Sequence, residues 1–111
     1  MNPKPCRGDI WMADLQPVIG HEQGGMRPCL IISDDLFNHG PADLVIALPI
    51  TSKDRDIPIR ISVEPPEGGL TVTSYVMPEM VRSISLQRLT RHLGAISPNK
   101  MRLVETHLRI V

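Results

Sequence analysis

Apolar and polar residues alternate with a period of two along most of the chain, which is typical of β-strands. Clusters of Gly, Pro and Asp separate these segments, as they do in small all-β sandwiches and barrels. We predict strands over Gly8–Leu15, Cys29–Ser33, Leu44–Leu48, Ile57–Val63, Leu70–Met77 and Val81–Ser85. Thr90–Ile96 fits either a last strand or a short helix.

Three of these segments differ in how their side chains are buried. Cys29–Ser33 and Leu44–Leu48 are almost wholly apolar, so we expect both faces of these strands to be covered. In Ile57–Val63 four branched apolar residues alternate with other residues, which predicts one buried face. Because Pro58 lacks an N–H group, this strand is expected at the edge of the sheet.

The C-terminal segment has the pattern of a helix. Ser97 can cap its first turn, and Pro98 suits the first helical position. Apolar residues then recur at helical spacing and predict a face that packs on the sheet: Met101, Val104, Leu108 and Val111. The pattern therefore predicts one mainly β (α+β) domain over residues 1–111, with a C-terminal helix.

Two predicted loops are long for so small a domain, namely Gln16–Met26 and Asp34–Asp43. Loops of about ten residues in a compact β domain often carry function. The first loop holds three glycines and ends at Arg27, directly before Pro28 and an apolar strand. A guanidinium held at the rim of a rigid sheet can grip a phosphate with two hydrogen bonds. The alternative is a surface ion pair of Arg27 with a nearby aspartate, Asp9 or Asp14.

Composition limits how the chain can bind a polyanion. Twelve Lys and Arg balance twelve Asp and Glu, which excludes binding to nucleic acid by bulk charge. Eleven prolines argue against a helical bundle, and one residue each of Trp, Tyr and Phe argues against a binder that stacks successive bases. Any polyanion site must be a local patch.

The longest apolar run, Leu44–Ile50, is too short to cross a membrane, and the N-terminus lacks the apolar stretch of a secretory signal. We therefore expect a cytoplasmic protein. Cys6 and Cys29 have no CxxC or Cys/His pairing, which argues against a structural zinc site and favours two reduced thiols. No metal or cofactor is expected, because the remaining candidate ligands have no partner at metal-ligand spacing: His39, His92 and His107.

Three ordered sequence blocks together cover nearly the whole chain. The first comprises Arg7-Gly-Asp-Ile-Trp11, Gln16-Pro-Val-Ile-Gly20 and Glu22-Gln-Gly-Gly-Met-Arg-Pro28; the second is Ile50-Thr-Ser-Lys53; the third is Glu79-Met-Val-Arg-Ser-Ile-Ser85 with Gln87-Arg-Leu89. In this order they resemble the MazF/PemK family of toxin endoribonucleases.

The resemblance implies a small SH3-like β-barrel of the CcdB type, with a C-terminal helix and one or two short helices. It implies a homodimer that cuts single-stranded RNA, with mRNA as the expected target, at short sequence motifs without a metal. Such cleavage uses the ribose 2′-hydroxyl as the nucleophile and leaves a 2′,3′-cyclic phosphate and a 5′-hydroxyl.

The family's catalytic pair maps onto Arg27 and Thr51. Arg27 would stabilise negative charge on the phosphate, and Thr51 would orient the phosphate by a hydrogen bond. A structural alternative for Thr51 is a hydroxyl that bonds the local backbone. A guanidinium is a poor base near neutral pH, so Glu22 is our candidate for the base that deprotonates the 2′-hydroxyl.

The same blocks indicate the RNA-binding residues, which are Gly20, His21, Gln23, Gly24, Gly25, Ser52, Lys53, Glu79, Met80 and Arg82. Two of them depart from the family pattern. His21 stands where relatives carry a small polar residue; it is interpreted as an RNA contact, a proton donor or a solvent-exposed side chain. Met80 replaces a frequent glutamine, so the RNA motif cannot be inferred from relatives.

The resemblance also implies a MazE-like antitoxin whose disordered acidic tail occupies the RNA groove and folds on binding. Two other functions fit the same fold. A CcdB-like toxin poisons gyrase without RNase activity, but such toxins use a C-terminal tail with a tryptophan, whereas this chain ends Leu-Arg-Ile-Val and has only Trp11. A protein that binds RNA or antitoxin without cutting is disfavoured by Arg27 and Thr51.

Overall fold

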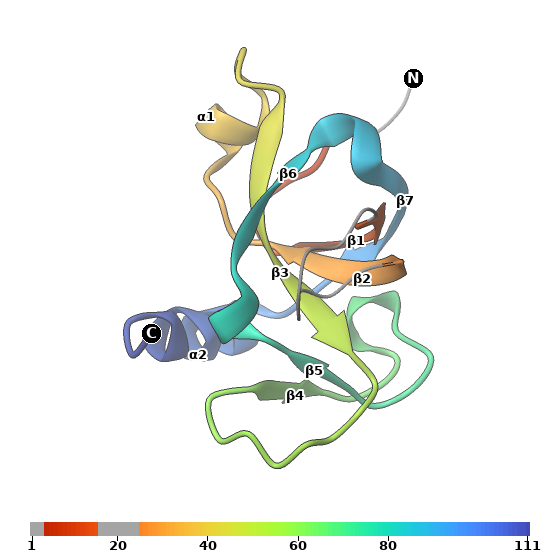
Figure 1. The fold of residues 1–111 in the computed structure, drawn as a ribbon, viewed down its shortest axis with the longest axis vertical. Helices are drawn as coiled ribbons and strands as arrows, with labels where there is room; N and C mark the ends of the chain where they lie inside the picture. The colour runs from red at the N-terminus through yellow and green to blue at the C-terminus, as the bar shows by residue number, and fades with distance from the viewer. Residues whose placement is uncertain (1–3, 16–24) are drawn as a thin grey trace.

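A computed structural model describes residues 4–15 and 25–111, and in this part of the chain seven strands form one antiparallel sheet. The strands are β1 (Asp9–Asp14), β2 (Met26–Ile31), β3 (Leu44–Thr51), β4 (Ile61–Val63), β5 (Ser74–Val76), β6 (Arg82–Ser85) and β7 (Leu89–Ala95). Their order is β4-β5-β3-β2-β1-β7, and β6 pairs with the first half of β3. The sheet curls into a half-barrel (Figure 1).

The helices of the described residues are short except for the last one. They are α1 (Asp35–Asn38), α2 (Pro98–Leu108) and three 3-10 turns, η1 (Glu67–Gly69), η2 (Pro78–Met80) and η3 (Leu86–Arg88). As predicted, Ser97 caps α2, because its side chain accepts a hydrogen bond from the Lys100 amide at 3.1 Å. None of these helices is long and apolar enough to cross a bilayer.

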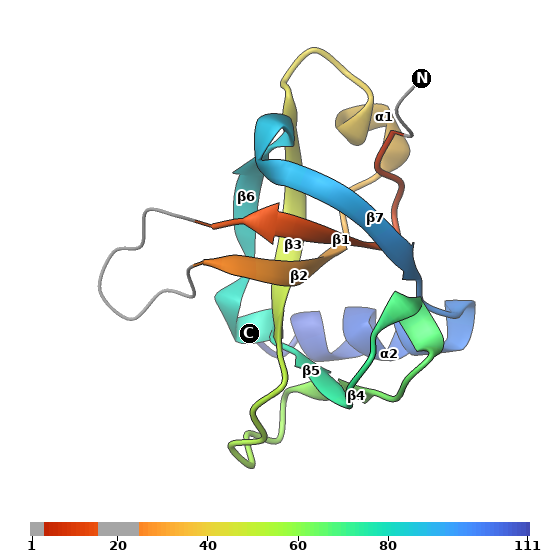
Figure 2. The same ribbon diagram turned by 90° about the vertical axis from the view of Figure 1, so that its right-hand side faces the viewer.

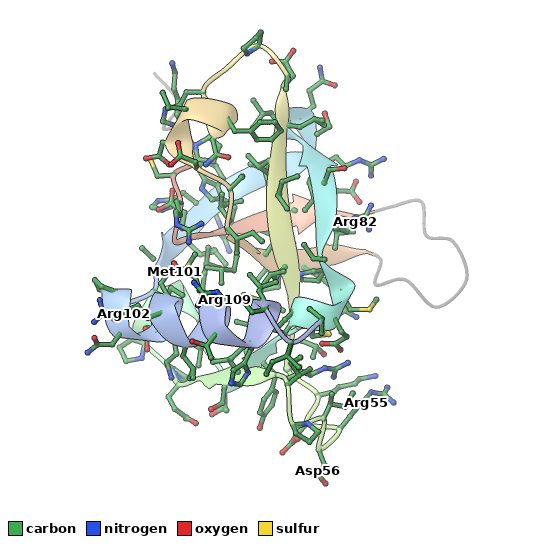
Figure 3. The ribbon with its side chains drawn as sticks, turned by 90° about the vertical axis from the view of Figure 1, so that its left-hand side faces the viewer. Arg55, Asp56, Arg82, Met101, Arg102 and Arg109 are labelled. Carbon is green, nitrogen blue, oxygen red and sulfur yellow. The ribbon has the colours of Figure 1, made fainter. Side chains whose placement is uncertain are left out.

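Both faces of β2 and β3 contribute to a core, as their apolar runs predicted. One core lies between the two arms of the curled sheet and α2 (Figure 2); its members include Ile10, Leu30, Leu48, Ile61, Val76, Met101 and Val104. Figure 3 shows Met101 pointing from α2 toward the sheet. The other core is on the opposite face and includes Trp11, Ala13, Cys29, Ile31, Val45, Ala47 and Ile84.

Two predicted strands are shorter than their alternation suggested. In Ile57–Val63 only Ile61–Val63 forms a strand, because Pro58 lies in a turn that follows the positive φ of 53° at Asp56. This strand does lie at the edge of the sheet, as predicted. In Leu70–Met77 only Ser74–Val76 pairs with neighbours, because the preceding residues form bends.

The other element predictions are confirmed with small changes. Thr90–Ile96 corresponds to a strand, β7. The loop Asp34–Asp43 contains α1, which Asp34 caps by accepting the Leu36 amide at 2.8 Å. On α2, Met101 and Val104 are buried, but Val111 lies beyond the helix and is 60% exposed. The predicted fold class, mainly β with a C-terminal helix, is confirmed.

Candidate functional site

Arg27 and Thr51 lie on neighbouring strands, one near the start of β2 and the other at the end of β3. The last pair of β2 and β3 joins Cys29 to Pro49, and Arg27 and Thr51 each lie two residues beyond this pair. Beyond the last pair the two strands diverge (Figure 2). Arg27 and Thr51 therefore stand on the two sides of the wedge between β2 and β3.

A cleft of about 380 Å³ lies at this wedge. Arg27 and Pro28 line it from β2, and Ile50 and Ser52 line it from the end of β3. Its remaining walls are the segment between η1 and β5 together with side chains of β1, β2 and β7, namely Met12, Met26, Gly69, Leu70, Thr71, Val72, Ser74, Arg91 and Leu93. The cleft therefore combines apolar walls with two arginines, Arg27 and Arg91.

The Thr51 hydroxyl is held in place by the local backbone. Thr51 is only 6% exposed, and its Oγ1 accepts a hydrogen bond from the Lys53 amide at 3.2 Å. Pairing with Tyr75 of β5 fixes its backbone. The hydroxyl does bond the local backbone, which was the structural alternative for this residue. A hydroxyl that accepts one hydrogen bond can still donate its own hydrogen to a phosphate oxygen.

A second arginine of the predicted site, Arg82, acts electrostatically on the same buried thiol as Arg27. Burial raises the pKa of the Cys29 thiol to about 12, and the charges of Arg82 and Arg27 oppose this rise. Both guanidinium groups therefore lie near the same thiol. Figure 3 shows Arg82 pointing outward from β6, on the side away from α2. We refer to Arg27 and Arg82, whose charges both act on the Cys29 thiol, as the cationic patch of the candidate site.

Two predicted RNA-binding residues, Glu79 and Met80, lie in η2, between β5 and β6 in the chain. The Glu79 carboxylate oxygen Oε2 accepts from Arg60 Nε at 2.8 Å and lies 2.7 Å from Arg60 Nη2. Met80 is half-buried beside it. The Glu79 carboxylate is thus engaged in an ion pair that joins η2 to the segment before β4.

The remaining predicted residues fall into two groups. Ser52 and Lys53 are exposed directly after β3, and Gly25 accepts the Leu15 amide at 2.9 Å with a positive φ of 73°. The others lie outside the described residues: Gly20, His21, Glu22, Gln23 and Gly24.

The sequence did not point to the wall made by residues 69–74. This segment reaches the cleft because η1 lies against β7: a Cβ on Gly94 would be 2.6 Å from the Gly68 carbonyl carbon. Arg91 was missed as well. The sequence left Thr90–Ile96 as either a strand or a short helix, and only the folded β7 shows that Arg91 and Leu93 line the cleft.

Comparisons with known proteins support the predicted fold and family. Residues 6–111 match the model of a family described as PemK-like, MazF-like toxin of type II toxin-antitoxin system. The chain is 34% identical over 105 residues to endoribonuclease EndoA of Bacillus subtilis (strain 168), with 94% of this chain and 90% of that protein covered.

Solved structures show the same fold. MazF from Deinococcus radiodurans (Form-I) matches with a TM-score of 0.86 and 27% identity, covering 96% of this chain and 94% of that one. An endoribonuclease in complex with its cognate antitoxin, from Mycobacterial species, matches with a TM-score of 0.77 and 26% identity. This match covers 99% of this chain and 93% of that one.

Proposed function

Because the chain belongs to the PemK-like, MazF-like toxin family of type II toxin-antitoxin systems, we propose that it is a toxin that cleaves single-stranded RNA. The observation that carries this proposal is that Arg27 and Thr51 both lie two residues beyond the last pair of β2 and β3, and that Arg27 lines a cleft together with Ile50 and Ser52, the two neighbours of Thr51. The whole chain acts as one toxin domain in the cytoplasm, where cutting mRNA would stop translation and growth.

The proposed reaction is a transesterification that needs no metal. The 2′-hydroxyl loses its proton and its oxygen attacks the neighbouring phosphorus. The bond from phosphorus to the 5′-oxygen breaks and this oxygen takes up a proton from water, so the products are a 2′,3′-cyclic phosphate and a 5′-hydroxyl. Arg27 places fixed positive charge where the phosphorane gathers negative charge. Thr51 donates its hydroxyl hydrogen to a phosphate oxygen, and this holds the phosphate in line for attack.

A base must remove the 2′-hydroxyl proton, and a guanidinium stays protonated in proteins. We assign this role to Glu22, a carboxylate five residues before Arg27 in the chain. Replacing Glu22 by Gln keeps the size of the side chain and removes the base, so cleavage should slow by about 10²-fold or more. Glu22→Gln cleaving a short RNA at the wild-type rate would exclude this role.

The RNA path is proposed along the cationic patch and the loops around the wedge. Arg82 and Lys53 would contact phosphates, because the Lys53 amide bonds the Thr51 hydroxyl and Arg82 acts electrostatically on the same thiol as Arg27. Ser52, Glu79 and Met80, with the loop residues Gly20, His21, Gln23, Gly24 and Gly25, would contact the bases and set the RNA motif.

A homodimer is part of the proposal. The chain leaves an apolar hollow of about 210 Å³ beside the end of α2, lined by Pro58, Ile59, His107 and Ile110. Ile110 is 71% exposed there, and a second copy of the chain would cover it. Sedimentation equilibrium should show a dimer, and Ile110→Asp should shift it toward monomer.

An antitoxin is proposed as the second partner, since related structures contain a toxin with its cognate antitoxin. A disordered acidic tail would fold onto the cationic patch and block the RNA path. Hydrogen exchange of residues 16–26 should then change on adding the antitoxin. Identical exchange rates with and without it would contradict this binding site.

The proposed activity is tested on the purified chain in EDTA with a long single-stranded RNA. We expect discrete fragments that end in cyclic phosphate, and far fewer with Arg27→Ala. Thr51→Ser keeps the hydroxyl and serves as the matched control for Thr51→Val, which removes it. Intact RNA after incubation with wild-type protein would overturn the proposal and favour a toxin that acts by binding.

A further inference from the structure

Three side chains of different ligand classes meet where the N-terminal segment packs against α1. One ligand atom each of Cys6, Asp35 and His39 lie within 4.8 Å of one another. The Cys6 Sγ is 4.0 Å from His39 Nε2. Nothing in the sequence indicated this cluster, because Cys6 lies 33 residues before His39 in the chain, and the fold brings Cys6 to Asp35 and His39.

The backbone positions all three residues. The Asp35 carboxylate oxygen Oδ1 accepts the Arg7 amide at 2.7 Å, which joins the N-terminal segment to α1. The His39 Nε2 lies 2.8 Å from the Pro5 carbonyl oxygen, and the Cys6 amide donates to Asp9 Oδ2 at 2.8 Å. These contacts hold the thiol, the carboxylate and the imidazole on one side of the turn before β1.

The surroundings favour a cation. The carboxylates of Asp35 and Asp9 accept hydrogen bonds from the amides of Arg7 and Cys6, which places both negative charges beside the thiol. The same negative potential attracts a positively charged ion. Cys6 is half-buried, while Asp35 and His39 are exposed, so an ion can enter from solvent and keep a water ligand.

We propose that Cys6, Asp35 and His39 form a binding site for a divalent transition metal of the zinc class, with water as the fourth ligand. Thiolate and imidazole together suit zinc and disfavour calcium and magnesium, which prefer oxygen ligands. Donor atoms around tetrahedral zinc are about 3.5 Å apart, given bond lengths of about 2.0–2.3 Å. The observed separations require a closure of about 1 Å, which exposed side chains can make.

Binding releases one proton and involves no redox change. The thiol proton of Cys6 goes to solvent as the sulfur binds the metal. The imidazole stays neutral; if it binds through Nε2, its proton moves to Nδ1 and its hydrogen bond to Pro5 is given up. Asp35 contributes one carboxylate oxygen.

The metal would act on the fold rather than on RNA cleavage. The Ile46 amide, in the first half of β3, donates a hydrogen bond to the hydroxyl of Ser33, which precedes α1. Thr51 is the last residue of β3. Strands rise about 3.3 Å per residue, so the proposed metal site and Thr51 lie near opposite ends of β3 (Figure 1). A bound metal would tie residues 4–9 to α1 and raise the melting temperature.

The test is a titration of the full reduced chain with Co²⁺, a spectroscopic substitute for zinc. We expect a thiolate-to-cobalt charge-transfer band that saturates at one equivalent and disappears when Zn²⁺ displaces the cobalt. Cys6→Ser should abolish the band, and His39→Ala should weaken binding about tenfold or more. Cys29→Ala and His92→Gln remove the same ligand types elsewhere and should bind Co²⁺ like the wild type.

Two results would overturn the proposal, provided that circular dichroism shows folded variants. One is the absence of a saturable charge-transfer band in the wild type. The other is cobalt binding by Cys6→Ser with wild-type affinity. Neither result bears on RNA cleavage in EDTA, so this inference and the proposed function are tested separately.

Discussion

At the scale of single residues, the candidate site depends on where two strands place one charge and one hydroxyl. Arg27 is fixed by the pairing of β2 with β1, in which it lies opposite Ala13. Thr51 is fixed by the β3–β5 pairing and by the hydrogen bond from the Lys53 amide. Strand pairing therefore sets the backbone positions of both residues before any substrate binds, and the Lys53 amide also orients the Thr51 hydroxyl.

Cys29 makes the free energy of unfolding depend on pH at alkaline pH. Its folded-state pKa is raised from 9.0 to about 12 by burial, so the thiol stays protonated in the folded chain while the unfolded chain ionises above pH 9. Stability from this group is therefore complete below pH 9 and is lost between pH 9 and about 12. The expected slope is at most about 1.4 kcal/mol per pH unit.

Urea unfolding of wild type and Cys29→Ala across this range measures the effect. The variant loses packing at every pH, so the comparison concerns the slope of the unfolding free energy and not its level. We expect a shallower decline in the variant, because all other titrating groups are shared. Parallel curves would show that Cys29 ionises as easily in the folded chain as in the unfolded one.

At the scale of elements, the cleft wall depends on a close approach between η1 and β7. A Cβ on Gly94 would lie 2.6 Å from the Gly68 carbonyl carbon and 2.8 Å from the Gly69 amide nitrogen. Gly94→Ala should therefore destabilise the fold by about 3 kcal/mol and displace the wall made by residues 69–74.

Gly8→Ala is the matched control for this substitution. Gly8 has a positive φ of 92°, and no atom lies within 4 Å of a Cβ added there. Gly8→Ala should therefore lower stability only through backbone strain, by about 1–2 kcal/mol. Thermal unfolding of both variants compares the two effects. A melting temperature that falls no further in Gly94→Ala than in Gly8→Ala would contradict the close packing.

The ion pair between Arg60 and Glu79 joins η2 to the segment before β4 and should contribute to stability. The two side chains are only 10% and 27% exposed, so removing one charge leaves the other poorly solvated. Glu79→Gln should lower the unfolding free energy by about 1–2 kcal/mol. In a double-mutant cycle with Arg60→Gln, a coupling energy of about 1 kcal/mol is expected. Zero coupling would leave Glu79 free for the RNA contact alone.

At the scale of the whole molecule, the sequence predicted what local patterns encode. Alternation and apolar runs located most strands, and Ser97 with Pro98 located the start of α2. The divergence of β2 and β3, the wall at residues 69–74 and the cluster around Cys6 are long-range consequences of how the sheet curls. No local pattern carries that information, because each depends on pairing between distant segments.

The central claim is that Arg27 and Thr51 act together on one scissile phosphate. A kinetic double-mutant cycle tests it most directly, with single-turnover cleavage of a short RNA in EDTA by wild type, Arg27→Ala, Thr51→Ala and the double variant. Each single substitution should slow cleavage by about 10²–10³-fold, and the double variant should be little slower than the worse single variant. Wild-type rates in either single variant, or no cleavage by the wild type, would contradict the claim.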